Sequence, residues 1–457
     1  MKKDKQWILY LFISLIVVFF TAMLVLCGMY LDLRLNGVTS SLPEIPENDK
    51  WILTNSASDS QSSSEKLVSP AFIGIKNEAS GMCGAIYDKS ARETLNKNVE
   101  PLMTALFNGY AKKVLFDDDD RKNSFVRDIV NSDTYIYISL YNDLPSSVIL
   151  PGFYGSGSYM PLNESFDVKY IFVLPDGDTV KGICFDSELN AVVLSPIEHV
   201  PFNNVNYSAY NELSGFASFE FVSETYPEPV FTESFEVSSV MLVPSFSFYK
   251  FDLDDIKTVQ LLKTLDFNPN LVKSYAYNEN SVISFVGEEK ELYVSLSENT
   301  LYYNGFDKGI HLSEFLKYYP RGDGYTLTDT VLCVKYLMNS IDRILVGGDA
   351  LPTVVGVSYN GSEIVFKLKY FYNGIAVTEK THDVSVSIAG EYIKSIEAGV
   401  LFCDSGNLSI PVIPQKLALN ALESENEDDF TGYGAMLKSN VITGMAEFVW
   451  VARKDVE

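Results

Sequence analysis

Imidazole side chains are the usual bases of nucleophilic catalysis and common metal ligands, and this 457-residue sequence contains only three of them. His199 lies in a predicted loop, and His311 begins an apolar stretch. His382 stands beside Asp383 at the start of a predicted strand. None belongs to an H-E-x-x-H motif or a comparable pattern. We interpret all three as surface or strand-end residues and predict no catalytic residue among them.

Other short motifs stand in contexts that do not suit their chemistry. Ser63-Ser64-Glu65-Lys66 has the S-x-x-K spacing of serine acyltransferases but lies in a low-complexity segment with no S-D-N or K-T-G motif after it. Asp117 to Asp120 lack the spaced ligands of a calcium loop and are interpreted as a solvated loop. Arg321-Gly322-Asp323 is too short to indicate adhesion. We expect no metal, no cofactor, no small-molecule substrate and no enzymatic activity.

The five cysteines contain no C-x-x-C pair, so the sequence predicts neither a zinc ribbon nor a redox motif. Cys27 lies in or at a predicted membrane segment. Cys333 falls on the apolar face of a predicted helix, where we expect it in the core. Whether a disulfide forms among Cys83, Cys184, Cys333 and Cys403 stays open.

Composition and charge restrict the class of partner. The chain is 47% hydrophobic and 21% charged, which is ordinary for a globular protein. Its formal net charge is −25, and such a surface repels phosphate backbones. We therefore exclude nucleic acid as a partner and expect several domains, at about 100–200 residues each.

A hydrophobic segment near the N-terminus predicts a membrane anchor. No side chain from residue 6 to residue 31 is charged, and 14 of the 20 residues from Trp7 to Leu26 are Leu, Ile, Val or Phe. Twenty helical residues span roughly 30 Å, the thickness of the hydrocarbon core. A signal peptide is the alternative, but the apolar run is too long and lacks an A-x-A-like exit. The candidate anchor residues are Trp7, Leu11, Leu15, Phe19 and Leu26.

The charges that flank this segment predict its orientation. Lys2, Lys3 and Lys5 precede it, whereas acidic residues follow it. Basic residues stay on the cytoplasmic side, so we expect a single-pass protein of the cell membrane with a cytoplasmic N-terminus and an extracytoplasmic body.

The rest of the chain predicts an α+β protein in which helices pack on antiparallel sheets. We expect six segments, listed here in order: a cytoplasmic stub (1–6), the transmembrane helix (7–31), a Ser- and acid-rich tether (32–68), an N-terminal α+β domain (69–160), a mainly antiparallel β region with a helix near 254–265 (161–322), and a C-terminal helix-plus-sheet domain (323–457).

Hydrophobic periodicity predicts two long helices. In the first, residues 92–107, Pro101 is a candidate for a bend or a break, and Ser124 is a candidate cap for a second, short helix after it. The other long helix begins at a cap, Thr328 or Asp329, and ends at Gly347-Gly348. Their apolar stripes are Leu95, Val99, Leu102, Met103 and Leu106 in the first, and Val331, Val334, Leu337, Met338, Ile341 and Leu345 in the other.

Alternating residues predict strands. Pro175-Asp176-Gly177-Asp178 separates two strands of a hairpin, and a meander is expected over 281–303. Four strands follow the C-terminal helix, and one face of their sheet should pack on that helix while the other meets water. A tandem repeat of helix-plus-sheet modules is one interpretation of this order.

Aromatic residues are abundant, with 28 Tyr and 29 Phe. Such residues enrich both cores and interfaces, and both interpretations are open.

Several segments resemble the YycH family, regulators associated with the WalK-type sensor histidine kinase of Gram-positive bacteria, and in particular its divergent clostridial members. The lysine stub and single span carry part of the resemblance. The other segments are Asp133–Ile138 leading to Asp143–Ile149, Tyr370–Val377 (YFYNGIAV), and Phe448–Val451. The segment Tyr370–Val377 is the most specific and is also found in the related YycI proteins.

The resemblance implies a non-catalytic extracytoplasmic regulator of a two-component system. It would contact a WalK-like sensor histidine kinase, and a YycI-like protein, through membrane and outer surfaces. The sequence does not identify the contact residues, the sign of regulation or the signal. Two alternatives remain: an anchored cell-envelope hydrolase that uses paired carboxylates, and a ligand-binding or scaffold module for cell-wall material.

Overall fold

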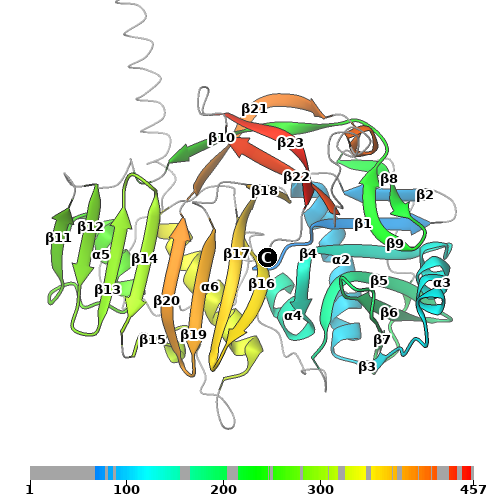
Figure 1. Cartoon of the computed structure of the whole chain (residues 1–457), viewed down its shortest axis with the longest axis horizontal. Coiled ribbons are helices and arrows are strands. Elements are labelled where there is room, and N and C mark those ends of the chain that lie inside the picture. The colour runs from blue at the N-terminus through cyan, green and yellow to red at the C-terminus, as the bar shows by residue number, and fades with distance from the viewer. Residues whose placement is uncertain are drawn as a thin grey trace, which may run out of the picture. The chain divides into compact units, whose positions relative to one another are not determined.

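The computed structural model is shown in Figure 1. It describes residues 67–77, 81–85, 89–154, 165–202, 215–244, 246, 251–277, 281–306, 308–316, 325–345, 351–372, 374–377, 383–399, 401–412, 414–418, 432–439 and 445–453. The chain divides into two compact units, Met1–Ser58 and Asp59–Glu457, and all described residues belong to the second unit. The predicted anchor residues and most of the predicted tether therefore lie outside the described residues.

The first half of the described chain forms a nine-stranded antiparallel sheet in the order β3-β7-β6-β5-β4-β1-β2-β8-β9 (Figure 1). Its strands are β1 (Phe72–Asn77), β2 (Gly81–Ala85), β3 (Tyr110–Lys113), β4 (Tyr135–Pro145), β5 (Asp167–Asp176), β6 (Thr179–Phe185), β7 (Ala191–Ser195), β8 (Phe216–Ser223) and β9 (Tyr226–Phe231). The predicted hairpin is confirmed as β5 and β6, and Gly177 in its turn has a positive φ of 61°.

Helix α2 (Lys89–Phe107) contacts β1, β2, β6 and β7. All five residues of its predicted stripe are buried, which confirms the stripe. The helix continues through Pro101, so no break occurs there. Proline removes one helical hydrogen bond, and we attribute the continuity to stripe residues buried on both sides of it, such as Val99 and Leu102.

Helix α3 (Asp119–Val130) begins earlier than predicted. Asp118 is its N-cap, and the Asp118 side chain accepts a hydrogen bond of 2.8 Å from the Arg121 backbone N–H. Ser124 lies inside the helix and is not the cap. Asp119 and Asp120 therefore belong to the first turn of the helix and not to a loop. Carboxylates are stabilising there because they lie near the positive end of the helix dipole.

The second half forms a fourteen-stranded sheet in the order β11-β12-β13-β14-β20-β19-β17-β18-β22-β23-β10-β21, with β15 also paired to β20 and β16 to β17. Its strands are β10 (Phe235–Pro244), β11 (Lys273–Tyr277), β12 (Val282–Val286), β13 (Lys290–Ser295), β14 (Thr300–Gly305), β15 (Ile310–His311), β16 (Leu351–Asn360), β17 (Glu363–Tyr372), β18 (Ile375–Val377), β19 (Val384–Ala389), β20 (Tyr392–Gly399), β21 (Leu401–Val412), β22 (Gly432–Ser439) and β23 (Met445–Arg453). The predicted meander is confirmed as β12, β13 and β14. Every pairing is antiparallel except β18 with β22.

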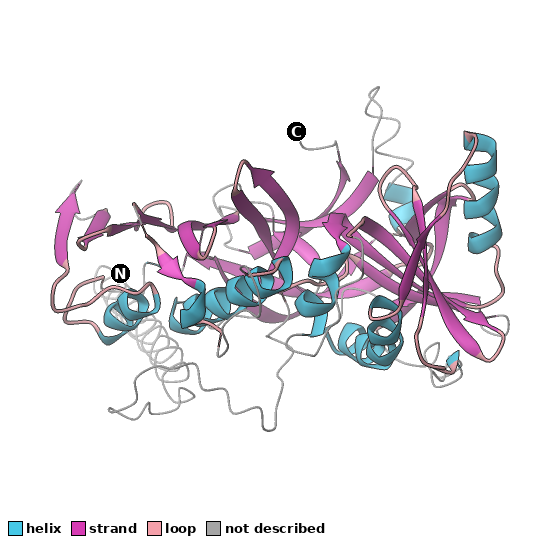
Figure 2. Ribbon diagram, turned by 90° about the horizontal axis from the view of Figure 1, so that it is seen from below, coloured by secondary structure: helices cyan, strands magenta, loops and turns pink. Residues whose placement is uncertain are grey.

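Helices α5 (Ile256–Thr264) and α6 (Leu327–Leu345) pack against each other and lie on one side of this sheet (Figure 2). All six stripe residues predicted for the C-terminal helix are buried in α6, as is Cys333. The predicted caps, Thr328 and Asp329, are inside the helix. Thr326 precedes it, and its N–H and hydroxyl both donate to the Asp329 carboxylate while the Asp329 N–H donates back to the Thr326 hydroxyl. This is a capping box with Asp in the position of Glu. The predicted end, Gly347-Gly348, lies outside the described residues.

Buried and solvent-facing side chains alternate along this sheet's strands, as predicted. In β17, Phe366, Leu368 and Tyr370 are buried, whereas Lys367 and Lys369 on the opposite face are exposed or half-buried. One face therefore meets the helix layer and the other does not.

The predicted boundaries at 160/161 and 322/323 stay predictions. Hydrogen bonds join β4 to β5 across the first of them and β14 to β20 across the second. Two further helices are α4 (Ser146–Tyr154), which contacts α2 and α6, and the 3-10 helix η5 (Leu312–Glu314).

Candidate partner-contact surface

The face of the meander that points away from α5 and α6 carries a row of tyrosines. Strand register pairs Tyr275 of β11 with Ser284 of β12, Ser284 with Tyr293 of β13, and Tyr293 with Tyr302 of β14. Side chains directly opposite one another in antiparallel strands project from the same face. Tyr277, two residues after Tyr275, shares this face. We call Tyr275, Tyr277, Tyr293 and Tyr302 the tyrosine face.

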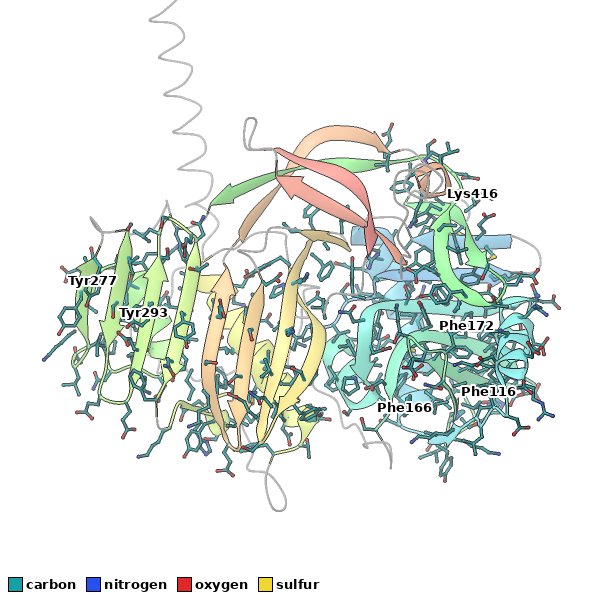
Figure 3. The ribbon with its side chains drawn as sticks, viewed as in Figure 1. Phe116, Phe166, Phe172, Tyr277, Tyr293 and Lys416 are labelled. Carbon is teal, nitrogen blue, oxygen red and sulfur yellow. The ribbon has the colours of Figure 1, made fainter. Side chains whose placement is uncertain are left out.

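The opposite face of β12, β13 and β14 is core. Its residues Phe285, Leu292, Val294, Leu301 and Tyr303 have no exposed surface. The exposed fractions of the tyrosine face, by contrast, are 44% for Tyr275, 51% for Tyr277, 38% for Tyr293 and 40% for Tyr302. Two of these residues, Tyr277 and Tyr293, are labelled in Figure 3.

Local contacts orient the tyrosine face. The ring centroids of Tyr293 and Tyr302 are 6.5 Å apart, within the range of aromatic pairs. Ser284 donates a hydrogen bond of 2.8 Å to Glu291, whose side chain projects from the same face. A hydrogen bond with Glu291 is the main cause that raises the pKa of Tyr293. The raised pKa keeps Tyr293 neutral at physiological pH. Exposed amphipathic rings suit contact with another protein.

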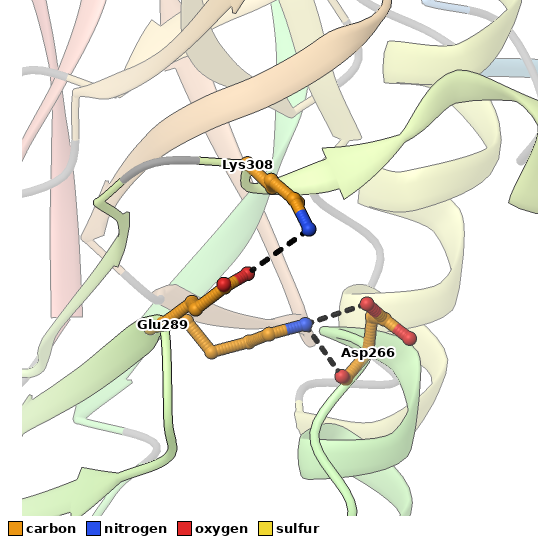
Figure 4. Close-up of polar contacts among 4 residues, drawn as sticks. Asp266, Glu289 and Lys308 are labelled. Atoms are coloured by element: carbon orange, nitrogen blue, oxygen red, sulfur yellow. Dashed lines mark hydrogen bonds and ion pairs between the residues drawn. The ribbon is translucent and has the colours of Figure 1, made fainter.

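One ion pair connects the meander to the segment after α5, and another joins two loops at the end of the meander (Figure 4). Lys290 of β13 donates to the backbone carbonyl of Asp266, 2.7 Å away, and to its carboxylate, 2.5 Å away. Lys308 Nζ lies 3.9 Å from Glu289 Oε2. Asp266 follows α5, so the two contacts of Lys290 help to hold the helix layer beneath the strands.

A second feature lies where the two sheets meet. The ladder between β4 and β5 shifts register between Ser139 and Leu144, and the ladder between β16 and β17 shifts between Val354 and Gly356. The two irregular segments contact each other: Asn142 Nδ2 donates to the Val355 carbonyl at 2.9 Å. Where the register shifts, backbone groups are not paired with the neighbouring strand, so they and the adjacent side chains can contact other parts of the molecule.

Tyr141 provides the rest of this contact. Its hydroxyl donates to the Gly374 carbonyl at 2.6 Å, and its ring centroid lies 4.2 Å from that of Phe371. It packs on a small buried cluster of Val355, Phe371 and Ala376. We call Tyr141, Asn142, Val355, Phe371, Gly374 and Ala376 the junction. The junction links two of the regions that carry the sequence resemblance. Tyr141 and Asn142 lie between Asp133–Ile138 and Asp143–Ile149, and Phe371, Gly374 and Ala376 lie within Tyr370–Val377.

Gly374 is required in the junction for two reasons. Its φ is +87°, a conformation that L side chains rarely adopt. A Cβ at this position would also overlap the guanidinium of Arg92, which is buried and donates to the carbonyls of Pro70 and Ala71.

The structure also shows one arrangement that the sequence did not suggest. His311 Nε2 lies 3.3 Å from Glu391, while His311 Nδ1 lies 2.7 Å from the Ser313 hydroxyl. Serine, imidazole and carboxylate are thus in a triad-like order. However, Nδ1 also accepts the Ser313 backbone N–H at 3.1 Å and so caps η5. We interpret the arrangement as a cap, in keeping with the predicted strand-end position of His311. Glu391 is 80 residues away, so no local motif could reveal it.

The other candidate residues are separate from these features. His199 is exposed, and His382 lies outside the described residues. In the described part of the chain, no group of three or more His, Cys, Asp or Glu residues could hold a metal ion. Cys83, Cys184 and Cys333 are buried free thiols. Burial raises the pKa of Cys83 to about 11 and also raises the pKa of the other two, so these thiols stay protonated and unreactive.

None of the helices in the described part of the chain is long and apolar enough to cross a membrane. The predicted span over residues 7–31 is not among them and stays a prediction.

Comparisons with known proteins gave matches in structure only. No protein-family model matches the sequence, and no curated protein matches it. The crystal structure of YycH from Bacillus subtilis is similar, with a TM-score of 0.54 and 13% sequence identity, over 87% of this chain and 96% of that chain. An uncharacterized protein from Eubacterium rectale aligns with a TM-score of 0.30 and 11% identity, over 48% of this chain and 77% of that one, which is too low for any argument. The chain therefore has a YycH-like α+β fold with antiparallel sheets.

Proposed function

We propose that this protein is a membrane-anchored extracytoplasmic regulator that modulates a sensor histidine kinase of a two-component system by protein–protein contact. The observation that carries the proposal is the YycH-like fold, which covers 87% of the chain. The family that the sequence resembles acts on a WalK-type kinase, and a YycI-like protein is the second expected partner.

The predicted anchor supports this function physically. A single span holds the outer body at a high effective concentration beside another membrane protein. A bound regulator biases a kinase between two conformations only if it binds one of them better. The span has few small residues for close helix contact and no G-x-x-x-G motif, so we expect the outer surfaces to contribute much of the binding.

The tyrosine face is our candidate for the outer contact. Two of its exposed tyrosines, Tyr293 and Tyr302, lie on β13 and β14, whose other face is buried, so they are presented on a rigid support. Tyrosine is among the residues that dominate interface energetics, at about 2 kcal/mol or more for a well-buried example.

The test compares variants of the full chain with a WalK-type kinase, both embedded in lipid nanodiscs. The double variant Tyr293→Ser and Tyr302→Ser should weaken binding at least tenfold and reduce the effect on kinase autophosphorylation. Tyr110→Ser is the matched control, since Tyr110 is exposed on β3 of the other sheet. Equal binding by all three proteins would remove the tyrosine face from the proposal. If the unsubstituted chain neither binds the kinase nor changes its activity, the proposed function itself is wrong.

The anchor is tested separately. Replacing Trp7–Leu26 by an unrelated span of equal length should change kinase output if the spans contact each other. Unaltered output would limit the contact to the outer body.

A second candidate function is a binding module for cell-wall material, because a row of exposed tyrosines also suits stacking on sugar rings. Sedimentation of the full chain with purified peptidoglycan tests it. Binding that is lost in the same double variant, without kinase binding, would favour this alternative.

A further inference from the structure

Sheet edges expose unpaired backbone N–H and C=O groups, and proteins usually protect them with charge, proline or covering elements. Three of the edge strands that the structure describes, β3, β9 and β16, are protected. Strand β3 carries adjacent Lys112 and Lys113. Strand β9 carries Pro227 and Pro229, and α3 lies against it. Strand β16 is joined to β4 at the junction through Asn142.

Strand β11 is different. It ends the fourteen-stranded sheet, and among the described residues it pairs only with β12. All five of its residues, Lys273 to Tyr277, are exposed. It contains no proline and only one charged residue, Lys273. By the criteria that β3, β9 and β16 meet, β11 is an open edge that can accept another strand.

The sequence of β11 is complementary to itself. In an antiparallel pair centred on Tyr275, Tyr275 of one copy lies opposite Tyr275 of the other. Lys273 lies opposite Tyr277, and Ser274 lies opposite Ala276. Lysine over a tyrosine ring is a favourable cation–π pair, and no like charges face each other. This register pairs all five residues of the strand.

We infer that β11 pairs antiparallel with β11 of a second copy of this chain, which joins two sheets into one across a two-fold axis at Tyr275. The pairing is isologous, because each copy uses the same strand, and it therefore closes at a dimer. Both tyrosine faces then lie on the same side of the joined sheet and form one continuous aromatic surface. The inference does not depend on the kinase as partner.

Cysteine cross-linking of the full chain in membranes tests the register. Directly opposed residues in antiparallel strands have Cα atoms about 4.5–5.5 Å apart, within disulfide range. Tyr275→Cys should therefore give a disulfide-linked dimer on mild oxidation. Lys273→Cys alone should not, because the two copies of residue 273 are four residues out of register. A mixture of Lys273→Cys and Tyr277→Cys should give the heterodimer.

The amount of disulfide-linked dimer in each variant is compared with that in the unsubstituted chain, which measures cross-linking by the native cysteines. Dimer from Tyr275→Cys and from the mixture, but not from Lys273→Cys alone, supports the inference. Failure of both expected pairs, equal cross-linking at all positions, or cross-linking of residue 275 to a different protein would each overturn it.

A second measurement does not rely on cysteine. Tyr275→Lys places two ammonium groups opposite each other at the two-fold axis and should weaken dimerisation at least tenfold in analytical ultracentrifugation of the full chain in detergent. Tyr359→Lys is the control, because Tyr359 is also exposed but lies on β16. Circular dichroism checks that both variants are folded. A monomeric unsubstituted chain, or an equal effect of both variants, contradicts the inference.

Discussion

The two sheets of this molecule place the same kind of side chain in opposite environments. In the nine-stranded sheet, aromatic rings form a dense interior: Tyr137 is fully buried, with its ring centroid 4.9 Å from that of Phe172 and 5.0 Å from that of Phe221. In the meander of the fourteen-stranded sheet, four tyrosines are exposed in a row. Aromatic abundance therefore serves the core in one region and the surface in the other.

The buried polar groups of the two regions include both paired and unpaired examples. In the first, the Tyr137 hydroxyl donates to the Pro227 carbonyl, and the Tyr170 hydroxyl donates to Glu228 at 3.0 Å. In the second, Asp342 Oδ1 of α6 is buried without a hydrogen-bond partner among the described residues. Paired groups contribute to a single stable packing, whereas an unpaired carboxylate lowers stability in its charged form.

The largest effect is expected in the aromatic interior. Tyr137→Ala should lower the free energy of unfolding by about 3–5 kcal/mol, because it leaves a cavity and an unpaired carbonyl. Denaturant titration of the full chain in detergent measures this loss. Tyr137→Phe keeps the ring and should cost only about 1 kcal/mol. A loss below about 1 kcal/mol for Tyr137→Ala would mean that the rings do not form a core.

The next effect depends on pH. Burial raises the pKa of Asp342 to about 7 from 3.8, and the nearby Arg343 opposes this only in part. Between these values the native protein keeps a proton that the unfolded chain has lost, so this group lowers stability progressively as pH rises from about 4 to about 7. Asp342→Asn should be more stable than the unsubstituted chain by about 2–4 kcal/mol at pH 8 and equal to it near pH 4. Unfolding titrations at both pH values test this, and a pH-independent difference would contradict it.

A smaller effect is expected at the junction between the regions. Gly374→Ala introduces strain at a φ of +87° and displaces Arg92, which should cost about 1–3 kcal/mol. Gly390→Ala is the matched control, because Gly390 also has a positive φ, +58°, but has nothing within 4 Å of the added Cβ. Its cost should be about 1 kcal/mol from the backbone alone. Equal unfolding free energies for the two variants would show that Arg92 moves aside freely.

The smallest effect on stability is expected on the tyrosine face. Tyr293→Ala should lower the free energy of unfolding by about 1 kcal/mol or less, since the ring is 38% exposed on the outer face of the sheet and its removal leaves no cavity in the core. The same titration measures it. A loss close to that of Tyr137→Ala would mean that the tyrosine face is part of a packed core, and the contrast between the two regions would disappear.

Local patterns predicted the parts of the fold that depend on neighbouring residues. The apolar stripes of α2 and α6 are buried as expected, and the hairpin around Gly177 has the expected turn. The errors were at helix starts. The sequence Asp117 to Asp120 is compatible with a loop and with the first turn of a helix. Thr326 precedes the periodic residues, and its role as a cap depends on where Asp329 is placed in the folded chain.

The candidate site was less accessible to sequence reasoning. Tyr275, Tyr293 and Tyr302 are far enough apart in sequence that only the strand register aligns them. Tyr141 and Gly374 are 233 residues apart, and their hydrogen bond depends on where both ladders are interrupted.

By itself, the sequence determined the α+β class, the periodicity of the main helices and strands, and the strongly acidic charge, because these properties depend on composition and on short spacings. Only the tertiary structure decided which sheet face is covered by α5 and α6, which edge is left open, and where the two sheets touch. Burial and strand pairing depend on segments that are distant along the chain. The alternation of residues within a single strand does not show whether the outer face of the sheet is exposed to solvent or covered by another layer.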